Sequence, residues 1–444
     1  MINIKQITAV FTKLPIEEIG NLSGFFKREN KLTALSFILS FFTSFSDGNG
    51  FQTSIWVQNL SFIIGEPITK YGFTKRLGWL CVNFCQQVVA EAIHYNLCKA
   101  ATWRSEAKWL SNFNRVFLED STILKLPKSL YEIFGGGANQ KESYAMTRVQ
   151  LRMDLTSERI QKISINSYAQ TDLTFASDIL SFLRFGDLVI RDLGYFKIEI
   201  FEKIHLLGAY FISRWHPSVQ FRCPKTKEAL DIGQFLAKAE KKGIEAIDQF
   251  FLLGLKTNFS VRFIALKVPQ DVEAKRRKAA LEREKKSGRK YSEKYFEHLG
   301  WTIYITNIPI EMFDFSAIWA IYRLRWRIEI IFKAWKSHLN ILEVMKDNKS
   351  LNPCQIIIRL YLVMAWIVLG LIPAYNFFLS QIYKTEKRFV SLAKFADYYR
   401  NNFENIVNEL DWEKHIPFVK CFCLYEKRIR HRNYFENLFT INLS

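Results

Sequence analysis

The sequence lacks the features that mark several classes of protein. Its seven cysteines include no CxxC pair and its seven histidines show no metal-ligand spacing, which argues against a disulfide framework and a structural zinc site. Its best membrane candidate, residues 360–372, has 13 apolar residues, whereas a helix needs roughly 18 to 20 to cross a bilayer. We therefore expect a buried helix there and no membrane partner. Lys5 and Lys13 are not followed by an apolar stretch with a cleavage site, so we expect no signal peptide.

The charge and the length are more informative. The chain has 62 basic and 43 acidic residues, a formal net charge of +19, which favours a polyanionic partner. Nucleic acid is the obvious candidate, and an anionic membrane surface is the alternative. A length of 444 residues with 49% hydrophobic content predicts a folded protein of two to four domains.

The most informative segment is YRLRWRIEIIFKAWK, which begins at Tyr322. At about 100° per residue, one continuous helix would gather its polar side chains on one stripe beside an apolar core stripe. For any single charged residue, a solvated helix with salt bridges explains the charge as well. The residues on the polar stripe are Tyr322, Arg325, Glu329, Lys333 and Lys336.

Tyr, two residues, Arg, three residues, Glu, six residues and Lys form the signature of bacterial insertion-sequence transposases of the DDE class. Tyr322, Arg325, Glu329 and Lys336 match this signature without a gap, and the chain resembles the family from about Asp120 to Lys336. The resemblance implies an α/β fold, a ribonuclease-H-like catalytic core with a β-rich insertion, flanked by helical N- and C-terminal regions. It also implies that two aspartates and Glu329 hold two divalent ions, Mg²⁺ with Mn²⁺ as a substitute.

Two aspartates follow apolar strands upstream. Asp120 ends the strand predicted from Arg115 and begins a segment that runs to three glycines, as in the first motif of the family. Asp192 ends a second strand and precedes a Gly-aromatic turn, although Leu193 stands where the family usually has a polar residue. Composition alone does not distinguish these aspartates from Glu119 and Asp187, and the family motifs favour Asp120 and Asp192.

These residue types suit phosphodiester chemistry. Two hard divalent ions about 3.5–4 Å apart neutralise charge at phosphorus and stabilise both reacting oxygens, and carboxylates are their natural ligands. By the resemblance, Tyr322, Arg325, Lys333 and Lys336 contact DNA phosphates. Trp301 opens an apolar strand 21 positions before Tyr322, where family members have a tryptophan that stacks on a flipped base. The alternative for Trp301 is a core tryptophan in a β-strand.

The organisation along the chain agrees with these expectations. Residues 68–76 predict a turn leading into a basic helix, residues 149–165 predict a β-hairpin, and residues 173–185 predict a helix. A basic run at 275–290, with nine basic residues, and another at 427–432 fit either solvated surface or contacts with DNA. The predicted domains are a helical DNA-end-binding region at 1–110, the first part of the core at 111–200, a β-rich insertion at 201–310, the acidic helix of the core at 311–345 and a helical C-terminal region with a role in dimerisation at 346–444.

The resemblance implies a transposase that binds the terminal inverted repeats of its element in double-stranded DNA. It would cleave the ends with metal ions, pass through a DNA hairpin and join the ends to target DNA. A homodimer in the DNA complex and a cytoplasmic, nucleoid-associated location in a bacterium are further implications. The alternatives are a catalytically inactive DNA-binding relic and a ribonuclease-H-like nuclease without transposition.

Overall fold

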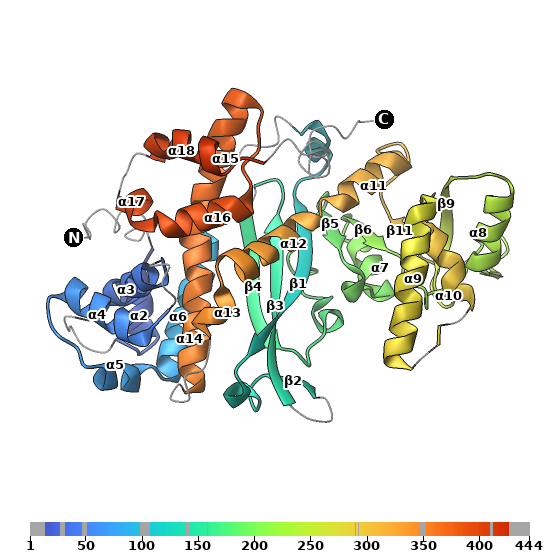
Figure 1. Ribbon diagram of the computed structural model, residues 1–444. Coiled ribbons are helices and arrows are strands. Elements are labelled where there is room, and N and C mark those ends of the chain that lie inside the picture. The colour runs from blue at the N-terminus through green and yellow to red at the C-terminus, as the bar shows by residue number, and fades with distance from the viewer. Residues whose placement is uncertain are drawn as a thin grey trace. The chain divides into compact units, whose positions relative to one another are not determined.

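The structure, a computed structural model, describes residues 14–26, 32–46, 51–97, 107–138, 143–157, 159–288, 290–291, 293–345, 352–408 and 412–425 (Figure 1). These residues form two compact units, and each unit is assembled from separate stretches of the chain. The helix-rich unit comprises the described residues within Met1–Thr102, Ser121–Gln170 and Trp326–Phe435. The sheet-rich unit comprises those within Trp103–Asp120 and Thr171–Arg325. The predicted division into five domains stays a prediction.

A mixed sheet organises the sheet-rich unit. The first part of β1 (Val116–Leu126) pairs in parallel with β5 (Leu188–Arg191), and β5 pairs in parallel with β6 (Tyr210–Arg214). The paired residues of β1 and all four residues of β5 are buried, as expected for parallel strands covered on both faces. The sheet continues through β11 (Trp301–Thr306), β10 (Ser260–Lys267), β9 (Ala246–Leu253), β7 (Phe221–Arg222) and β8 (Ala229–Leu230), which are antiparallel to their neighbours.

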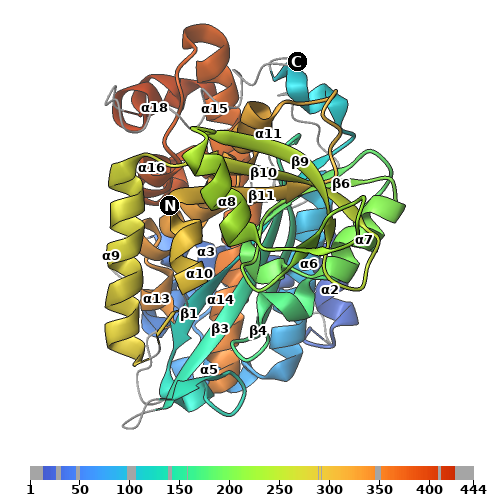
Figure 2. The ribbon, with the colours of Figure 1, turned by 90° about the vertical axis from the view of Figure 1, so that its right-hand side faces the viewer.

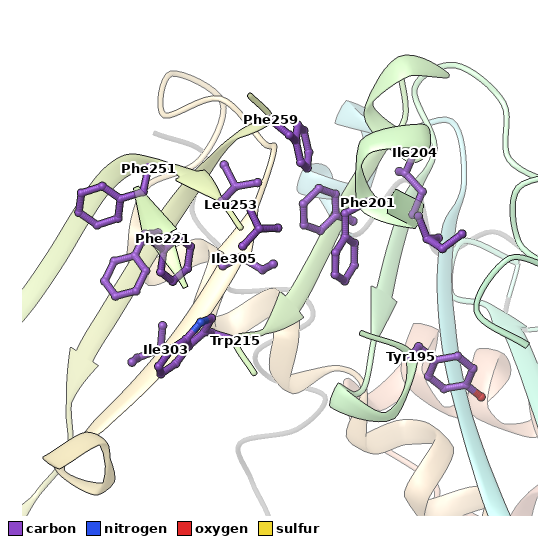
Figure 3. Close-up of a cluster of buried hydrophobic side chains, with 14 of the residues drawn as sticks. Tyr195, Phe201, Ile204, Trp215, Phe221, Phe251, Leu253, Phe259, Ile303 and Ile305 are labelled. Carbon is purple, nitrogen blue, oxygen red and sulfur yellow. The ribbon is translucent and has the colours of Figure 1, made fainter. Parts of the chain in front are cut away.

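An apolar cluster holds this sheet and its helices together (Figure 3). Phe201 and Ile204 project from α7 (Ile198–Leu206), and Phe201 stacks on Phe211 of β6 with ring centroids 4.4 Å apart. Ile303 and Ile305 of β11 join the same cluster, and the two alternate along the strand with residues of the opposite face. The remaining helices of this unit are α8 (Ile232–Lys241), α9 (Gln270–Ser287), α10 (Glu293–Glu297) and α11 (Phe315–Arg323).

Most of the basic run at 275–290 lies in α9. This helix is long and lies beside α10 in Figure 2, and most of its side chains are exposed. Such a helix gains little from burial, so ion pairs along its surface support it, as between Lys275 and Asp271 at 2.9 Å. The second basic run, at 427–432, lies outside the described residues.

The helix-rich unit contains the predicted hairpin. The strand β3 (Ser143–Asp154) pairs antiparallel with β4 (Arg159–Ser167), so the hairpin prediction is confirmed, and β2 (Gly135–Ala138) pairs antiparallel with the first residues of β3. The helix α6 (Trp79–Leu97) packs against β4 and against α14 (Pro353–Trp366).

The N-terminal helices of this unit bury an apolar seam with a few polar contacts. In α3 (Ala34–Ser46) every residue except Leu35 is buried, and Ser40 accepts a hydrogen bond from the indole of Trp56 at 3.0 Å. The predicted turn and basic helix are confirmed as α5 (Lys70–Arg76), in which the Thr69 hydroxyl accepts the Gly72 amide. The other helices here are α2 (Ile16–Leu22) and α4 (Thr53–Ile64).

The apolar segment near residue 360 lies inside a continuous helical stretch. Pro353–Glu386 is long and apolar enough to cross a membrane by length and composition, and 78% of its most apolar window is buried inside the protein. The prediction of a buried helix at 360–372 is therefore confirmed. The other helices are α12 (Trp326–Lys333), α13 (Ile341–Val344), α15 (Ile372–Glu386), α16 (Leu392–Asn401), α17 (Phe403–Asn408) and α18 (Ile416–Phe422).

The predicted fold class is confirmed. The strand order β4-β3-β1-β5-β6, with β1, β5 and β6 parallel, is that of a ribonuclease-H-like core, and β7 to β11 add the β-rich insertion. Helical regions occupy both ends of the described chain.

The predicted helix at 173–185 is wrong. Residues Asp172–Phe175 form a 3-10 turn, and i to i+3 turns continue to Phe182. Two arginine side chains donate to backbone carbonyls of this segment: Arg191 to Ala176 at 2.8 Å and Arg115 to Phe182 at 2.9 Å. In an α-helix these carbonyls would accept backbone amides, and here they accept the arginine side chains instead. The apolar periodicity of the segment gives no indication of these donors.

Candidate active site

Asp120 and Asp192 lie next to each other just past the residues at which β1 and β5 pair in parallel. The strand β1 itself continues to Leu126, so the prediction that this strand ends at Asp120 is wrong. The register pairs Glu119 of β1 with Arg191 of β5, so the following residues, Asp120 and Asp192, are also neighbours. Asp192 keeps an extended backbone, with φ −76° and ψ 164°, which continues the direction of β5. Because adjacent strands lie about 4.8 Å apart and paired residues share a face, the two carboxylates meet on one side of the sheet.

The same row continues across two further strands. Arg191 pairs with Ser213 of β6, so the residue after Ser213, Arg214, is the neighbour of Asp192. Arg214 pairs in turn with Tyr304 of β11. The row is therefore Asp120, Asp192, Arg214 and Tyr304, on the face opposite the apolar cluster.

One guanidinium group contacts both carboxylates, and its single positive charge offsets one of their two negative charges. Nη1 of Arg325 donates to Oδ2 of Asp120 at 2.6 Å, and Nε of the same side chain lies 3.9 Å from Oδ1 of Asp192. The side chains of Asp120 and Arg325 are 13% and 16% exposed, whereas that of Asp192 is 40% exposed. The pair is therefore open to solvent on the Asp192 side.

Tyr322 lies beneath Arg325. The guanidinium carbon of Arg325 lies 5.9 Å from the centroid of the Tyr322 ring, and the ring of Tyr304 lies 4.8 Å away on the sheet. Burial raises the pKa of Tyr322, and its hydroxyl is buried with no hydrogen-bond partner among the described residues. A buried hydroxyl without a partner is costly, so an acceptor atom that reaches it, from water or from a ligand, removes that cost.

The prediction of one helix from Tyr322 to Lys336 is wrong. Tyr322 belongs to α11, the chain then makes two i to i+3 turns at Leu324 and Arg325, and a new helix, α12, begins at Trp326. A π-helical turn at Ala334–His338 follows, closed by the hydrogen bond from the Leu339 amide to the Ala334 carbonyl at 3.0 Å. The chain folds Arg325 toward Asp120 at this break, which a regular helical wheel cannot represent.

The remaining residues of the signature lie in the helix-rich unit. Glu329 is half-buried and Lys333, four residues later on α12, is exposed, so these two still share one face of the helix. Lys336 lies in the π-helical turn, and burial lowers its pKa. Their predicted roles as metal ligand and DNA contacts stay predictions.

The nearest alternative carboxylates have structural partners. Glu119 accepts a hydrogen bond from Arg191 at 2.6 Å in a buried ion pair, and Asp187 accepts the Arg184 amide at 2.8 Å and pairs with Arg115 at 2.5 Å. Both ion pairs lock β1 to β5, and Asp187 lies at the amino ends of these strands, away from Asp192.

We expect Glu119→Ala to destabilise the fold. The substitution leaves Arg191 buried without this carboxylate, so the free energy of unfolding should fall by about 3–5 kcal/mol, measured by urea denaturation. Asp271→Ala, which breaks an exposed ion pair on α9, is the control and should leave the transition midpoint unchanged. Equal midpoints for both variants would contradict a structural role for Glu119.

Trp301 is covered in this structure. It is 3% exposed and belongs to the apolar cluster with Trp215 and Ile303, and the Lys267 ammonium lies 5.5 Å from its ring centroid. This is the environment of a core tryptophan in a strand. Stacking on a flipped base stays a prediction for Trp301, and it requires the ring to become accessible.

The sequence alone did not single out Arg214 and Tyr304. Arg214 ends an apolar strand just as Asp192 does, and this was the signal that could have identified it. Arg214 and its partner Tyr304 are 90 residues apart in the sequence and meet only because β11 pairs with β6. Local spacing does not reveal this pairing.

The chemistry of the acid pair fits a hard divalent ion. Carboxylate oxygens are the ligands that Mg²⁺ prefers, and it binds through one or two protein carboxylates while keeping several waters. Asp120 and Asp192 provide two such groups on rigid strands. Across the described residues, no three His, Cys, Asp or Glu side chains are grouped closely enough to hold a metal ion.

Comparison with known proteins shows to which family the chain belongs. Residues 111–365, which include Asp120, Asp192 and Glu329, match the family model described as transposase DDE domain. The transposase for insertion sequence element IS231B of Bacillus thuringiensis subsp. berliner is 29% identical over 361 residues, 78% of this chain and 74% of that protein. The transposase for element IS1151 of Clostridium perfringens is 26% identical over 360 residues, 77% of this chain and 75% of that protein.

Proposed function

Because the chain belongs to the family of bacterial insertion-sequence transposases with a DDE domain, we propose that it cuts DNA at the ends of its own element and joins them to target DNA. The observation that carries this proposal is the Asp120–Asp192 pair just past the parallel-paired residues of β1 and β5, contacted by one guanidinium. Two adjacent carboxylates on buried strands are poorly explained by stability alone, since like charges side by side are destabilising.

Asp120, Asp192 and Glu329 would hold two Mg²⁺ ions, for which Mn²⁺ is a substitute. When bound, such ions neutralise charge at phosphorus and stabilise the attacking and leaving oxygens. The residues of the chain itself bind and orient the DNA. Arg325 presents a planar fork that matches two phosphate oxygens, and the buried Tyr322 hydroxyl has a donor to offer to the same phosphate.

Lys333 and Lys336 would contact further phosphates as point charges. The helix α5, with Lys75 and Arg76 in its last turn, is the proposed element of end recognition. A homodimer in the complex with double-stranded DNA would let a protomer bound at one end cut the other. The cytoplasm of a bacterium, with the nucleoid, is the proposed location.

The proposed reaction begins with hydrolysis of one strand, which exposes a 3′ hydroxyl. That hydroxyl attacks the opposite strand and forms a hairpin on the DNA end, with loss of the flanking DNA. Water then opens the hairpin, and the restored 3′ hydroxyl attacks the target strand. Trp301 is the proposed stacking platform for the flipped base of the hairpin.

The test incubates purified protein and Mg²⁺ with DNA carrying the two ends of the element, and resolves the products on a denaturing gel. Nicks at the ends followed by hairpin species are expected, and Glu329→Gln should abolish both while leaving DNA binding intact. Hairpins formed normally by Trp301→Phe, whose smaller ring stacks less, would remove the proposed role of Trp301.

Two other outcomes of the same gel decide against the proposal. Binding without cleavage in either Mg²⁺ or Mn²⁺ identifies a DNA-binding relic. Cleavage whose products never join a second DNA identifies a nuclease without transposition.

A further inference from the structure

Arginine side chains gather around Tyr304 in the sheet-rich unit, on the face that carries Asp120 and Asp192. Arg214 is the cross-strand partner of Tyr304, so their side chains are neighbours. Arg276 reaches this face from α9, where it donates to the Thr302 hydroxyl at 2.9 Å and to the Trp301 carbonyl at 3.0 Å. Thr302 precedes Tyr304 by two residues, so both point to the same side of β11.

A third arginine comes from the helix above this face. Arg323 of α11 lies over the ring of Trp319, 4.7 Å from its centroid, and the next residue but one, Arg325, holds the acid pair. The charges of Arg214, Arg276 and Arg323 all act on Tyr304, where burial raises the pKa and the arginines oppose that rise. Burial first, and Arg214 second, lower the pKa of Arg276.

Within the part of the chain that the structure describes, Arg214, Arg276 and Arg323 form no ion pair with Asp or Glu. Like charges held together in this way repel each other, and an anion would relieve the repulsion. The buried Tyr322 hydroxyl, which has no partner among the described residues, lies against Tyr304 and adds an unused polar group beside the cluster.

We propose that Arg214, Arg276 and Arg323 form a binding site for a DNA backbone phosphate beside the Asp120–Asp192 pair. The row across the strands has an acidic half, Asp120 and Asp192, and a basic half that begins at Arg214. A DNA strand with its reacting phosphate at the acidic half places a neighbouring phosphate at the basic half. This inference rests on the proposed function, because it takes the ligand of the acidic half to be DNA.

The experiment measures binding of full-length protein to two labelled duplexes of equal length, one carrying an element end and one of random sequence, across a series of salt concentrations in EDTA. Arg214→Ala is the main variant, because Arg214 is exposed and its loss leaves no buried group without a partner. Loss of a charge-assisted contact should weaken binding to both duplexes by about 10-fold or more. The slope of log K against log salt should become shallower by about 0.9.

Arg184→Ala is the matched control. It removes the same charge from an exposed arginine of the same unit, but Arg184 precedes β5 and so lies at the amino ends of the parallel strands. Its affinity and salt slope should equal those of the wild type, and Arg214→Lys should recover part of the affinity.

The outcomes separate this inference from the proposed function. If the wild type cuts element ends but Arg214→Ala binds with the wild-type affinity and slope, the phosphate site is refuted and the transposase proposal stands. If Arg214→Ala loses affinity and slope while the wild type never cuts, the phosphate site stands and the proposed reaction fails. An equal loss in Arg184→Ala would show that overall charge is responsible and would also refute the site.

Discussion

Asp192→Asn should reduce the rate of DNA-end cleavage by about 10³-fold or more, since loss of one preorganised charge-stabilising group already costs about 10²–10³-fold. The substitution keeps the shape of the side chain and removes the charge that a divalent ion requires. Asp192 is the more exposed member of the pair, and Arg325 retains its 2.6 Å contact with Asp120, so the fold should be preserved. Single-turnover cleavage in Mg²⁺ measures the effect.

Asp271→Asn provides the control for this prediction, because it removes one carboxylate from the exposed surface of α9 in the same unit. It should cut DNA at the wild-type rate. Asp192→Asn should bind the element end in EDTA at least as tightly as the wild type, since it repels phosphate less. A cleavage rate within about 10-fold of the wild type would exclude Asp192 as a metal ligand, because that is less than one preorganised group contributes.

Patterns that depend on neighbours in sequence predicted much of this fold. The hairpin of β3 and β4 follows from alternating residues around a polar turn, and α5 follows from the turn and the basic residues at 68–76. The strand that ends at Asp192 is a short run of buried apolar residues before a turn. Each of these features is indicated by a pattern that its own segment contains.

The two helices that were predicted wrongly share one cause. At Ala176 and at Arg325 the backbone departs from a regular helix where a hydrogen bond joins the segment to a charged side chain outside it. Arg191, 15 residues along the sequence, donates to the Ala176 carbonyl. Arg325 donates to the carboxylate of Asp120, which is 205 residues away. Helical periodicity carries no information on such partners, so it extends a helix through the point where they act.

The site was predicted in part for the same reason. The motifs indicated Asp120, Asp192 and Arg325, but the basic half of the row appears only when β6 and β11 pair. Arg214 has no special neighbours in sequence, and its partner Tyr304 is 90 residues away. Glu119 was hard to distinguish from Asp120 until the register showed that successive residues of β1 point to opposite faces.

Arg325→Ala should reduce DNA-end cleavage by about 10²–10³-fold, as loss of one preorganised donor to a transferring phosphoryl group does. The same substitution should tighten binding of Mn²⁺ in the absence of DNA by about 10-fold, because the guanidinium no longer competes with the ion for Asp120 across a largely buried 2.6 Å contact. Mn²⁺ binding, followed by electron paramagnetic resonance, therefore moves in the direction opposite to activity.

Opposite signs in the two measurements are what distinguish Arg325 from a residue that merely supports the fold. A destabilised site would lose metal affinity together with cleavage. Arg325→Lys keeps the charge without the planar fork, so it should bind Mn²⁺ close to the wild type and still cut DNA poorly. Arg184→Ala, at the other end of the strands, should change neither quantity. Weaker Mn²⁺ binding by Arg325→Ala would mean that the guanidinium orders the two carboxylates for the ion and does not compete with it.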